Sequence, residues 1–248
     1  MTRTWDLNAD IGEGDEVMDA ALLDIITSAN VACGGHAGDA ESMRRVCDLA
    51  AARGVAIGAQ VSYVDREGFG RRRLDIPPAA LAEQVAEQLG ALDAHARAAG
   101  SRVTYVKPHG ALYHAAVSDP RTAEAVLAGS SGLPMLTLPH GALRTLSRER
   151  GVDVHAEAFA DRGYAADGGL VPRDARGALL ENVDEVTARV QRLVRDGAIV
   201  AVDGTVLRVD AASLCVHSDT PGADVIARTV RDVLVASGVM PAPFAGGA

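Results

Sequence analysis

Short polar segments that follow strand-like apolar runs carry the residues that could do chemistry. The first segment reads Asp6-Leu-Asn-Ala-Asp-Ile-Gly-Glu-Gly14 and brings Asn8, Asp10 and Glu13 close together in the chain. Neighbouring carboxylates can hold a cation or act as a general base, although solvated acids in an ordinary loop give the same pattern. We predict that Asp10 and Glu13 are catalytic and that Asn8 contacts a substrate.

A glycine-rich turn after the second apolar run presents an imidazole. Residues 34–36 end in His36, with Asn30 before the turn and Asp39 after it. Backbone N–H groups at a helix start attract anions, and a histidine can move protons near neutral pH. A single histidine in a turn is as often structural as functional, so its polar neighbours carry the prediction. We predict His36 as a catalytic residue and, with Asp10, a metal ligand, and Asn30 and Asp39 as substrate-binding residues.

The segment Lys107-Pro108-His109 ends a later apolar run with a cation, a rigid residue and an imidazole. A buried ammonium at this place can neutralise a phosphoryl oxygen or polarise a carbonyl group. The alternative is a lysine that extends from the strand end into solvent. We predict Lys107 and His109 as catalytic residues and Tyr113, on the following helix, as substrate-binding.

Arginines and one more histidine follow the last predicted strands. Glu157 and Arg162 close one strand, Arg173 comes after a glycine-rich stretch, and His217 ends the final strand. An arginine fork can bind a carboxylate through two hydrogen bonds, although a surface pair between Asp161 and Arg162 is a rival interpretation. We predict that Glu157, Arg162, Arg173 and His217 bind the substrate.

The loop Gly68-Phe-Gly-Arg-Arg72 alternates glycines with cations. Gly68, Gly70, Arg71 and Arg72 are therefore predicted to bind phosphate, although the loop matches no full nucleotide-binding fingerprint. The sequence contains neither a Walker A motif nor a GxSxG elbow.

Apolar runs of strand length alternate with helix-period segments along the whole chain, which is typical of βα units and a mainly parallel sheet. We expect strands at residues 4–8, 29–33, 55–60, 103–107, 134–138, 152–157 and 213–217, and clear helices starting at Pro77, Val183 and Pro221. Asp203-Gly204 splits two β-branched runs within residues 198–210 and predicts a hairpin. The repeated Pro-His-Gly-Ala-Leu at 108–112 and 139–143 predicts two strand-to-helix corners.

Seven strands and a hairpin suggest a barrel, with its closure left open. Because the carboxyl ends of successive strands in such folds meet in one mouth, we expect the polar segments to converge there. We predict one (β/α) barrel domain at residues 1–240 and a frayed C-terminal tail at 241–248.

Composition narrows the function classes. The net charge of -9 and the pI near 5.2 argue against a nucleic-acid partner, which would need a basic face. The chain shows neither a signal peptide nor an apolar run of membrane length, so we expect no membrane association. Three cysteines without a CxxC pair favour a reducing compartment, and we predict a cytoplasmic enzyme.

In order and spacing, these segments resemble the LamB/YcsF family from Asp6 to about Gly222. The matching stretches are Asp6-Leu-Asn with Asp10, Ser28-Ala-Asn with Cys33-Gly and His36-Ala-Gly-Asp39, Gly68-Phe-Gly-Arg-Arg72, Val106-Lys-Pro-His-Gly-Ala-Leu-Tyr113, Phe159-Ala-Asp-Arg162, Ala166-Asp-Gly, Leu170-Val-Pro-Arg173, and Val216-His with Asp219-Thr-Pro-Gly222. The resemblance implies an α/β fold, a seven-stranded (β/α) barrel of the glycoside hydrolase/deacetylase type.

The resemblance also implies component A of an ATP-dependent 5-oxoprolinase, which acts with subunits B and C to open the lactam of 5-oxo-L-proline to L-glutamate. ATP would be a co-substrate, and a divalent metal, Mg²⁺ with ATP, would accompany it. Within that reaction we expect Lys107 to stabilise the negative charge that develops on a phosphoryl group or oxyanion. Asp10 and Glu13 would bind Mg²⁺ or act as a base. His36 and His109 would transfer protons. Arg162 or Arg173 would bind the substrate carboxylate.

Two alternatives remain open. The first is a metal-dependent deacetylase or amidohydrolase that uses Asp10, His36 and His109 and no ATP. The second is a non-catalytic subunit that only binds a small substrate. Whether the chain forms a homo-oligomer is a separate question that the sequence leaves open. The family usually has a histidine where this chain has Gln60, which we assign to substrate binding; Ala9 and Gly35 replace a common Cys and Phe.

Overall fold

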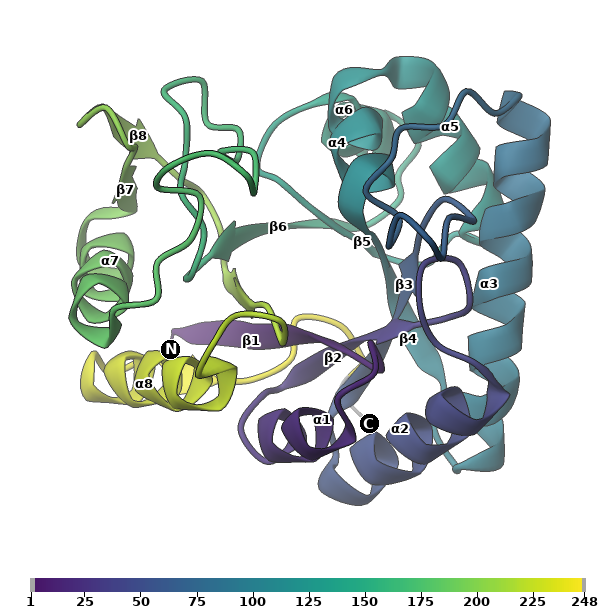
Figure 1. Cartoon of the computed structure of the whole chain (residues 1–248), viewed down its shortest axis with the longest axis horizontal. Helices are drawn as coiled ribbons and strands as arrows, with labels where there is room; N and C mark the ends of the chain where they lie inside the picture. The colour runs from purple at the N-terminus through teal and green to yellow at the C-terminus, as the bar shows by residue number, and fades with distance from the viewer. Residues whose placement is uncertain (1–2, 247–248) are drawn as a thin grey trace.

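Seven parallel strands close into a barrel in the computed structural model, which describes residues 3–246 (Figure 1). In order around the barrel the strands are β1 (Thr4–Ile11), β2 (Ser28–Ala32), β3 (Ala56–Val61), β4 (Val103–Pro108), β5 (Met135–Thr137), β6 (Val154–Phe159) and β9 (Ser213–Val216). β9 pairs with both β6 and β1, which joins the last strand to the first. The predicted parallel barrel is confirmed, and the closure that the sequence left open is complete.

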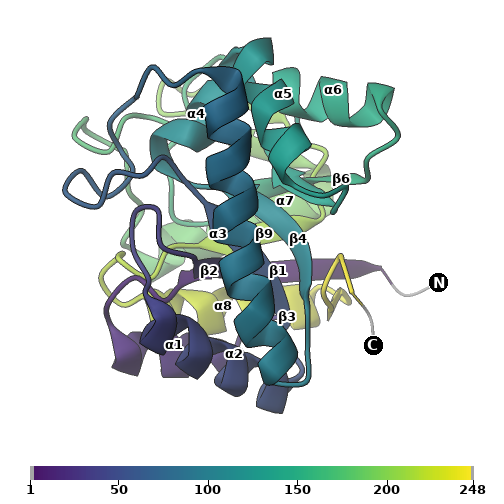
Figure 2. The ribbon, with the colours of Figure 1, turned by 90° about the vertical axis from the view of Figure 1, so that its right-hand side faces the viewer.

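Helices cover the outside of the barrel, and their apolar faces pack against the strands. They are α1 (Glu16–Leu23), α2 (Ala40–Arg53), α3 (Pro78–Ala98), α4 (Gly110–Ser118), α5 (Pro120–Gly129), α6 (Ala142–Glu149), α7 (Val183–Asp196) and α8 (Ala223–Ala236). Figure 2 shows the long α3 lying along β3 and β4, where Leu81, Val85 and Leu92 are buried. Burying each such side chain contributes about 1.5–3 kcal/mol. Among residues 3–246, no helix is both long and apolar enough to cross a membrane.

The interior of the barrel is polar, although its strands are buried on both faces. Along β1 the side chains of Asp6, Asn8 and Asp10 alternate with Leu7 and Ala9, and all five are buried. Because successive side chains in a strand point to opposite faces, the alternation sends the apolar set to the helices and the polar set into the barrel. Residues far apart in the sequence therefore meet inside.

Two features outside the barrel strands bear on the sequence predictions. The expected hairpin is confirmed as β7 (Ala198–Val200) and β8 (Val206–Arg208), an antiparallel pair. The segment expected to fray instead continues as β10 (Met240–Pro241), which pairs with β1, and the Phe244 ring packs 4.7 Å from the Tyr105 ring. Residues 247–248 of the predicted tail lie outside the described residues.

Both predicted strand-to-helix corners are also confirmed, since β4 leads into α4 and β5 leads toward α6. At the first corner Gly110 has φ 56°, and a Cβ there would lie 2.5 Å from the Gly70 carbonyl oxygen. The same oxygen accepts a hydrogen bond from the Ala111 N–H at 2.8 Å. The absence of a side chain at Gly110 thus lets the loop before α3 lie directly against the start of α4.

The close approach of the Tyr105 ring to Gly58 gives a prediction for stability. A Cβ at Gly58 would lie 2.1 Å from the Tyr105 ring, whose hydroxyl donates to Asn30 Oδ1 at 2.6 Å. Gly58→Ala should lower the free energy of unfolding by about 1–3 kcal/mol, because overpacking displaces this ring. Gly90→Ala, in α3 with open space around it, should raise that free energy by roughly 0.5–1 kcal/mol. Denaturant unfolding checks the pair, and equal effects would contradict the expectation.

Candidate active site

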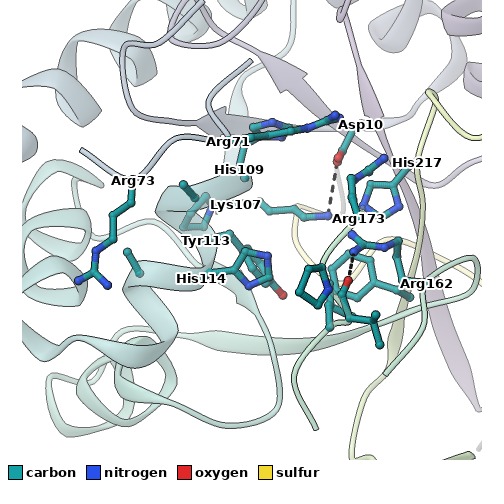
Figure 3. Close-up of a pocket in the computed structure, with 18 of the residues that line it drawn as sticks. Asp10, Arg71, Arg73, Lys107, His109, Tyr113, His114, Arg162, Arg173 and His217 are labelled. Atoms are coloured by element: carbon teal, nitrogen blue, oxygen red, sulfur yellow. Dashed lines mark hydrogen bonds and ion pairs between the residues drawn. The ribbon is translucent and has the colours of Figure 1, made fainter. Parts of the chain in front are cut away.

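A buried lysine ammonium lies at the centre of the mouth. Lys107 Nζ is 2.9 Å from Glu157 Oε2, 3.5 Å from Asp10 Oδ1 and 3.2 Å from Asn8 Oδ1. Lys107 lies on β4 and its partners lie on β6 and β1, so the barrel brings together three separate segments. Figure 3 shows the Lys107 side chain pointing toward Asp10, with His217 beside it. The predicted meeting of Asp10, Lys107 and His217 in one mouth is observed.

The electrostatics of this centre keep both charges in place. Burial alone would lower the pKa of Lys107, but Asp10 and Glu157 outweigh it and raise that pKa well above the ordinary value. Burial would raise the pKa of Asp10, but Lys107, His217 and His109 hold it below its usual range. The site therefore carries a fixed ammonium beside a fixed carboxylate at neutral pH.

An amide network below the lysine holds these groups. The Asn30 amide donates to Asn8 Oδ1 at 2.7 Å and to Asp10 Oδ1 at 2.9 Å. Asn8 in turn donates to Ser213 Oγ at 2.8 Å, and the Ser213 hydroxyl donates to Asp6. The predicted substrate residues Asn8 and Asn30 are thus buried supports of Asp10, so their own contact with a substrate stays a prediction.

An aspartate orients the last histidine of the mouth. Asp161 Oδ1 lies 3.0 Å from the ring nitrogen His217 Nδ1. Asp161 Oδ2 accepts hydrogen bonds from the backbone N–H of His217 at 3.1 Å and from the Thr220 hydroxyl at 2.7 Å. The His217 ring stacks on the Phe159 ring at 5.3 Å and 12°. With Nδ1–H donated to Asp161, Nε2 is the nitrogen available for proton transfer in the mouth.

A cavity of about 430 Å³ opens above Lys107. Its lining combines acidic, cationic and apolar side chains: Asp10, Arg71, Arg73, Lys107, His109, Tyr113, His114, Phe159, Arg162, Leu170, Val171, Pro172, Arg173 and His217. Burial raises the pKa of Tyr113 well above its ordinary value, so the phenol stays protonated. A small polar ring with an anionic group suits this lining, because apolar walls face a few placed charges.

Two arginines share one aspartate at the rim of the cavity. Arg71 Nη2 lies 2.6 Å from Asp219 Oδ2, and Arg173 Nη1 lies 2.8 Å from the same oxygen. The three residues come from the loops after β3, β6 and β9. Arg162, in contrast, donates to the carbonyl oxygens of Ala178 at 3.1 Å and Val171 at 2.7 Å, and so ties down a loop of the cavity wall.

A second polar cluster stands beside the lysine. The rings of His36 and His109 stack at 3.8 Å and 6°, and Glu13 Oε1 lies 3.0 Å from His36 Nε2 and 3.6 Å from His109 Nδ1. Gln60 Nε2 is 2.9 Å from His109 Nδ1, and Ser62 Oγ is 3.0 Å from His36 Nδ1. Burial and then His36 lower the pKa of His109 well below its ordinary value. His109 is therefore neutral at pH 7.

Some predicted site residues lie away from the cavity. Arg72 forms an ion pair with Asp65, and neither residue lines the cavity. Asp39 is the exposed N-cap of α2 and lies at a second cavity beyond His36. Gly68 and Gly70 shape the loop: a Cβ at Gly68 would lie 2.1 Å from an Asp65 oxygen. Phosphate binding by this loop stays a prediction, with Arg71 the residue that reaches the cavity.

A sequence model of the LamB/YcsF family matches residues 5–247. The chain belongs to the LamB/YcsF family. The A component of a 5-oxoprolinase from Streptomyces avermitilis is 54% identical over 97% of this chain and 99% of its own length. The crystal structure of a lactam utilization protein from Thermus thermophilus is 38% identical, with a TM-score of 0.89 over 97% of this chain and all of that one.

A more distant structure shows the fold alone. A peptidoglycan N-acetylglucosamine deacetylase is 11% identical to this chain, with a TM-score of 0.53 over 97% of this chain and 86% of that one. The architecture expected from the family resemblance, a barrel of the deacetylase type, is thereby confirmed.

Sequence reasoning missed several residues of this LamB/YcsF site. Cys215 Sγ lies 3.1 Å from Lys107 Nζ, and Phe159 supports both Lys107 and His217. Asp161 entered the sequence prediction only as one half of a rival surface pair with Arg162, but its carboxylate binds His217 instead. Alternation along β9 would have found Cys215, because His217 lies two positions on and points to the same face.

The two predicted metal ligands fall into different groups. Asp10, Cys215 and His217 offer ligand atoms within 4.8 Å of one another, and so do Glu13, His36 and His109. The first group does not suit a divalent ion, because the Lys107 ammonium already contacts both Asp10 and Cys215. Cys215 is also a poor ligand there, since burial raises its pKa well above the ordinary value. Only the second group has its ligand atoms clear of the lysine.

The Asp161–His217 pair predicts how stability depends on acid. Burial opposes the charge of Asp161, but His217 and the hydrogen bonds outweigh it and lower the pKa of Asp161 to about 2. Its contribution of about 2 kcal/mol is complete above the ordinary pKa near 4 and is lost as the pH falls from about 4 to about 2. In Asp161→Asn the free energy of unfolding should therefore fall less between about pH 4 and about pH 2 than in the wild type, as measured by urea unfolding at each pH. The same fall in the variant and in the wild type would contradict this role of the pair.

Proposed function

We propose that this protein is the A component of a 5-oxoprolinase and that its mouth opens the lactam ring of 5-oxo-L-proline. The observation that carries the proposal is the Lys107 ammonium, held by Asp10 and Glu157 at the base of a small cavity beside the Asp161–His217 pair. The relatives' names, a component of 5-oxoprolinase and a lactam utilization protein, support the substrate class.

The residues present suit attack on a cyclic amide. As water adds to the lactam carbon, negative charge grows on the carbonyl oxygen, and a preorganised ammonium such as Lys107 stabilises it. His217 Nε2 would accept a proton from the attacking water and return it to the ring nitrogen as the C–N bond breaks, while Asp161 holds the imidazole. Ring opening frees the amine of glutamate, and the former lactam carbonyl carbon becomes the side-chain carboxylate once any phosphoryl group has been released.

Coupling to ATP is the finer part of the proposal. An unstrained lactam is a poor electrophile, and transfer of a phosphoryl group to its carbonyl oxygen would activate the carbon. Arg71, Arg73 and Arg173 line the same cavity as Lys107 and would face an anionic group there. Water attack on the phosphorylated carbon and cleavage of the C–N bond would leave a glutamyl phosphate, from which a second water would release phosphate and give glutamate. Two waters are thus consumed overall, and Mg²⁺ would enter with the nucleotide.

We further propose that turnover needs subunits B and C, since the name of the Streptomyces relative designates one subunit. A cytoplasmic location fits the three cysteines, all of which are free and buried. Glutamate release from 5-oxoproline should then require the three subunits together with ATP. Turnover without ATP would overturn the coupling and favour an amidohydrolase, and complete turnover by this chain alone would overturn the need for partners.

Lys107→Met tests the proposed site in the assembly of three subunits. The kcat should fall roughly 10²–10³-fold, because the developing oxyanion loses its charged partner. His217→Gln should lower kcat roughly 10²–10⁴-fold with a smaller effect on KM, because proton transfer is lost while the cavity persists.

Arg97→Met and His155→Gln serve as matched controls. Arg97 forms an exposed pair with Asp93, and His155 forms a pair with Asp153 on β6, both away from the mouth. Each should retain wild-type turnover. Full activity of Lys107→Met, in protein whose circular dichroism matches the wild type, would assign this chain a binding role only.

A further inference from the structure

Two arginines and one aspartate join three loops across the rim of the lysine cavity. Arg71 follows β3, Arg173 follows β6 and Asp219 follows β9, so the contact links segments that are far apart in the sequence. We call these three residues the rim clasp. Both arginines line the cavity that holds Lys107 (Figure 3), whereas Asp219 does not line it. The two cations of the clasp therefore border the space that a ligand would fill, and its carboxylate does not.

The Asp219 carboxylate shows how the two guanidinium groups hold such a group. Arg173 Nη1 lies 3.0 Å from Asp219 Oδ1 and 2.8 Å from Asp219 Oδ2, and Arg71 Nη2 lies 2.6 Å from the same Oδ2. These separations are those of charge-assisted hydrogen bonds, and both carboxylate oxygens take part. The clasp is thus already a carboxylate-binding site, and its present occupant belongs to the chain itself.

The charges of the clasp do not cancel. Two guanidinium groups contact one carboxylate, and within residues 3–246 neither arginine forms an ion pair with a second carboxylate. The Arg71 guanidinium also lies 4.9 Å from the centre of the Phe69 ring, a cation–π contact that holds it at the rim. Arg73 and Arg162 line the same cavity and add positive charge. The rim therefore attracts anions although one carboxylate is already present.

The Asp219 side chain can leave the arginines without releasing its loop. Two nearby residues of that loop, His217 and Thr220, are held by the Asp161 carboxylate, and none of these hydrogen bonds involves Asp219. The aspartate side chain is 33% exposed and the two arginine side chains are 43% and 26% exposed. Because ion pairs at such a half-exposed rim contribute little to stability, the internal pair is easily exchanged.

The sequence assigned the substrate carboxylate to Arg162 or Arg173, and only one of them is available. Arg162 is buried and donates to the carbonyl oxygens of Ala178 and Val171. Arg173 is held only by the exchangeable pair with the clasp aspartate. Arg71, which the sequence assigned to phosphate, is its partner at the same carboxylate oxygen.

We propose that Arg71 and Arg173 form the binding site for the carboxylate of an entering ligand, and that Asp219 is the internal anion which this carboxylate displaces. The ligand class is a small ring that carries a free carboxylate. That the ring is a lactam rests on the function proposed above, whereas the exchange of carboxylates does not. A neutral ring gains nothing from the clasp, because it brings no charge to replace that of Asp219.

Removing the internal carboxylate distinguishes displacement from simple support. In Asp219→Asn the arginines have no internal anion to release, so their affinity for a carboxylate ligand should rise roughly 2–5-fold. If Asp219 only held the arginines in place, the same change would lower that affinity. Arg173→Gln should lower it roughly 10-fold, because the ligand loses a charged partner. Asp219→Glu keeps an internal anion and should bind like the wild type.

Ligand-detected NMR titration of the full chain checks these signs with three probes. 5-Oxo-L-proline carries a lactam and a carboxylate, cyclopentanecarboxylate carries only the carboxylate, and 2-pyrrolidone carries only the lactam. Asp219→Asn should tighten binding of the two carboxylates and leave 2-pyrrolidone unchanged. Added salt should also weaken carboxylate binding more steeply in Asp219→Asn than in the wild type, because no internal ion pair is broken there to offset the one that forms.

Asp196→Asn is the matched control. It makes the same change in net charge and removes the exposed partner of Arg195 at 2.8 Å, and neither residue lines the cavity. It should leave all three affinities unchanged.

Equal or lower carboxylate affinity in Asp219→Asn would overturn the displacement, and so would wild-type protein that binds neither carboxylate. Tighter binding of inorganic phosphate in Asp219→Asn, with no change for the carboxylates, would overturn the carboxylate assignment. If 5-oxo-L-proline binds no better than cyclopentanecarboxylate while both respond to Asp219→Asn, the clasp is supported and the lactam function alone fails.

Discussion

An ammonium buried inside a barrel is the constraint on which the rest of this structure depends. Taking Lys107 out of water costs several kcal/mol, and the cost is recovered only by well-placed opposite charges and hydrogen bonds. Asp10 and Glu157 supply the charges, and Asn8 supplies a carbonyl oxygen. Two carboxylates around one ammonium leave this centre with a net negative charge.

That constraint explains why the barrel interior is not filled with aliphatic side chains. Each carboxylate needs donors of its own, so Asn30 supports Asp10, and Ser213, Ser28 and Thr27 surround Asp6 deeper in the barrel. The aliphatic residues are displaced to the outer faces of the strands, where the helices cover them. Stability and site geometry are thus provided by opposite faces of the same strands.

The sequence predicted the barrel and its mouth because both depend on local periodicity and on strand ends. Asp10, Lys107 and His217 lie at strand ends, and strand order alone brings them together. The pairing of Asp161 with His217 could not be predicted in this way, because it depends on the conformations of two loops whose side chains approach across β6 and β9. Arg72 shows the converse, since its spacing suggested phosphate but its nearest carboxylate, Asp65, is seven residues away and binds it. Lys107 indicated the site more clearly than Arg72 did, because it is the only lysine among the 24 lysine and arginine residues of the chain.

The rim arginines show how such a site can admit an anion at little cost. Arg71 and Arg173 already share the Asp219 carboxylate, so their charges are partly compensated in the free protein. An entering carboxylate or phosphoryl group exchanges with Asp219 and does not have to desolvate two unpaired guanidinium groups. The net binding free energy from this exchange is then the difference between two ion pairs. Because the rim is half-exposed, salt screens both pairs and that difference is small. Specificity must therefore come from the buried charges below, where Lys107 and Asp10 are shielded from solvent.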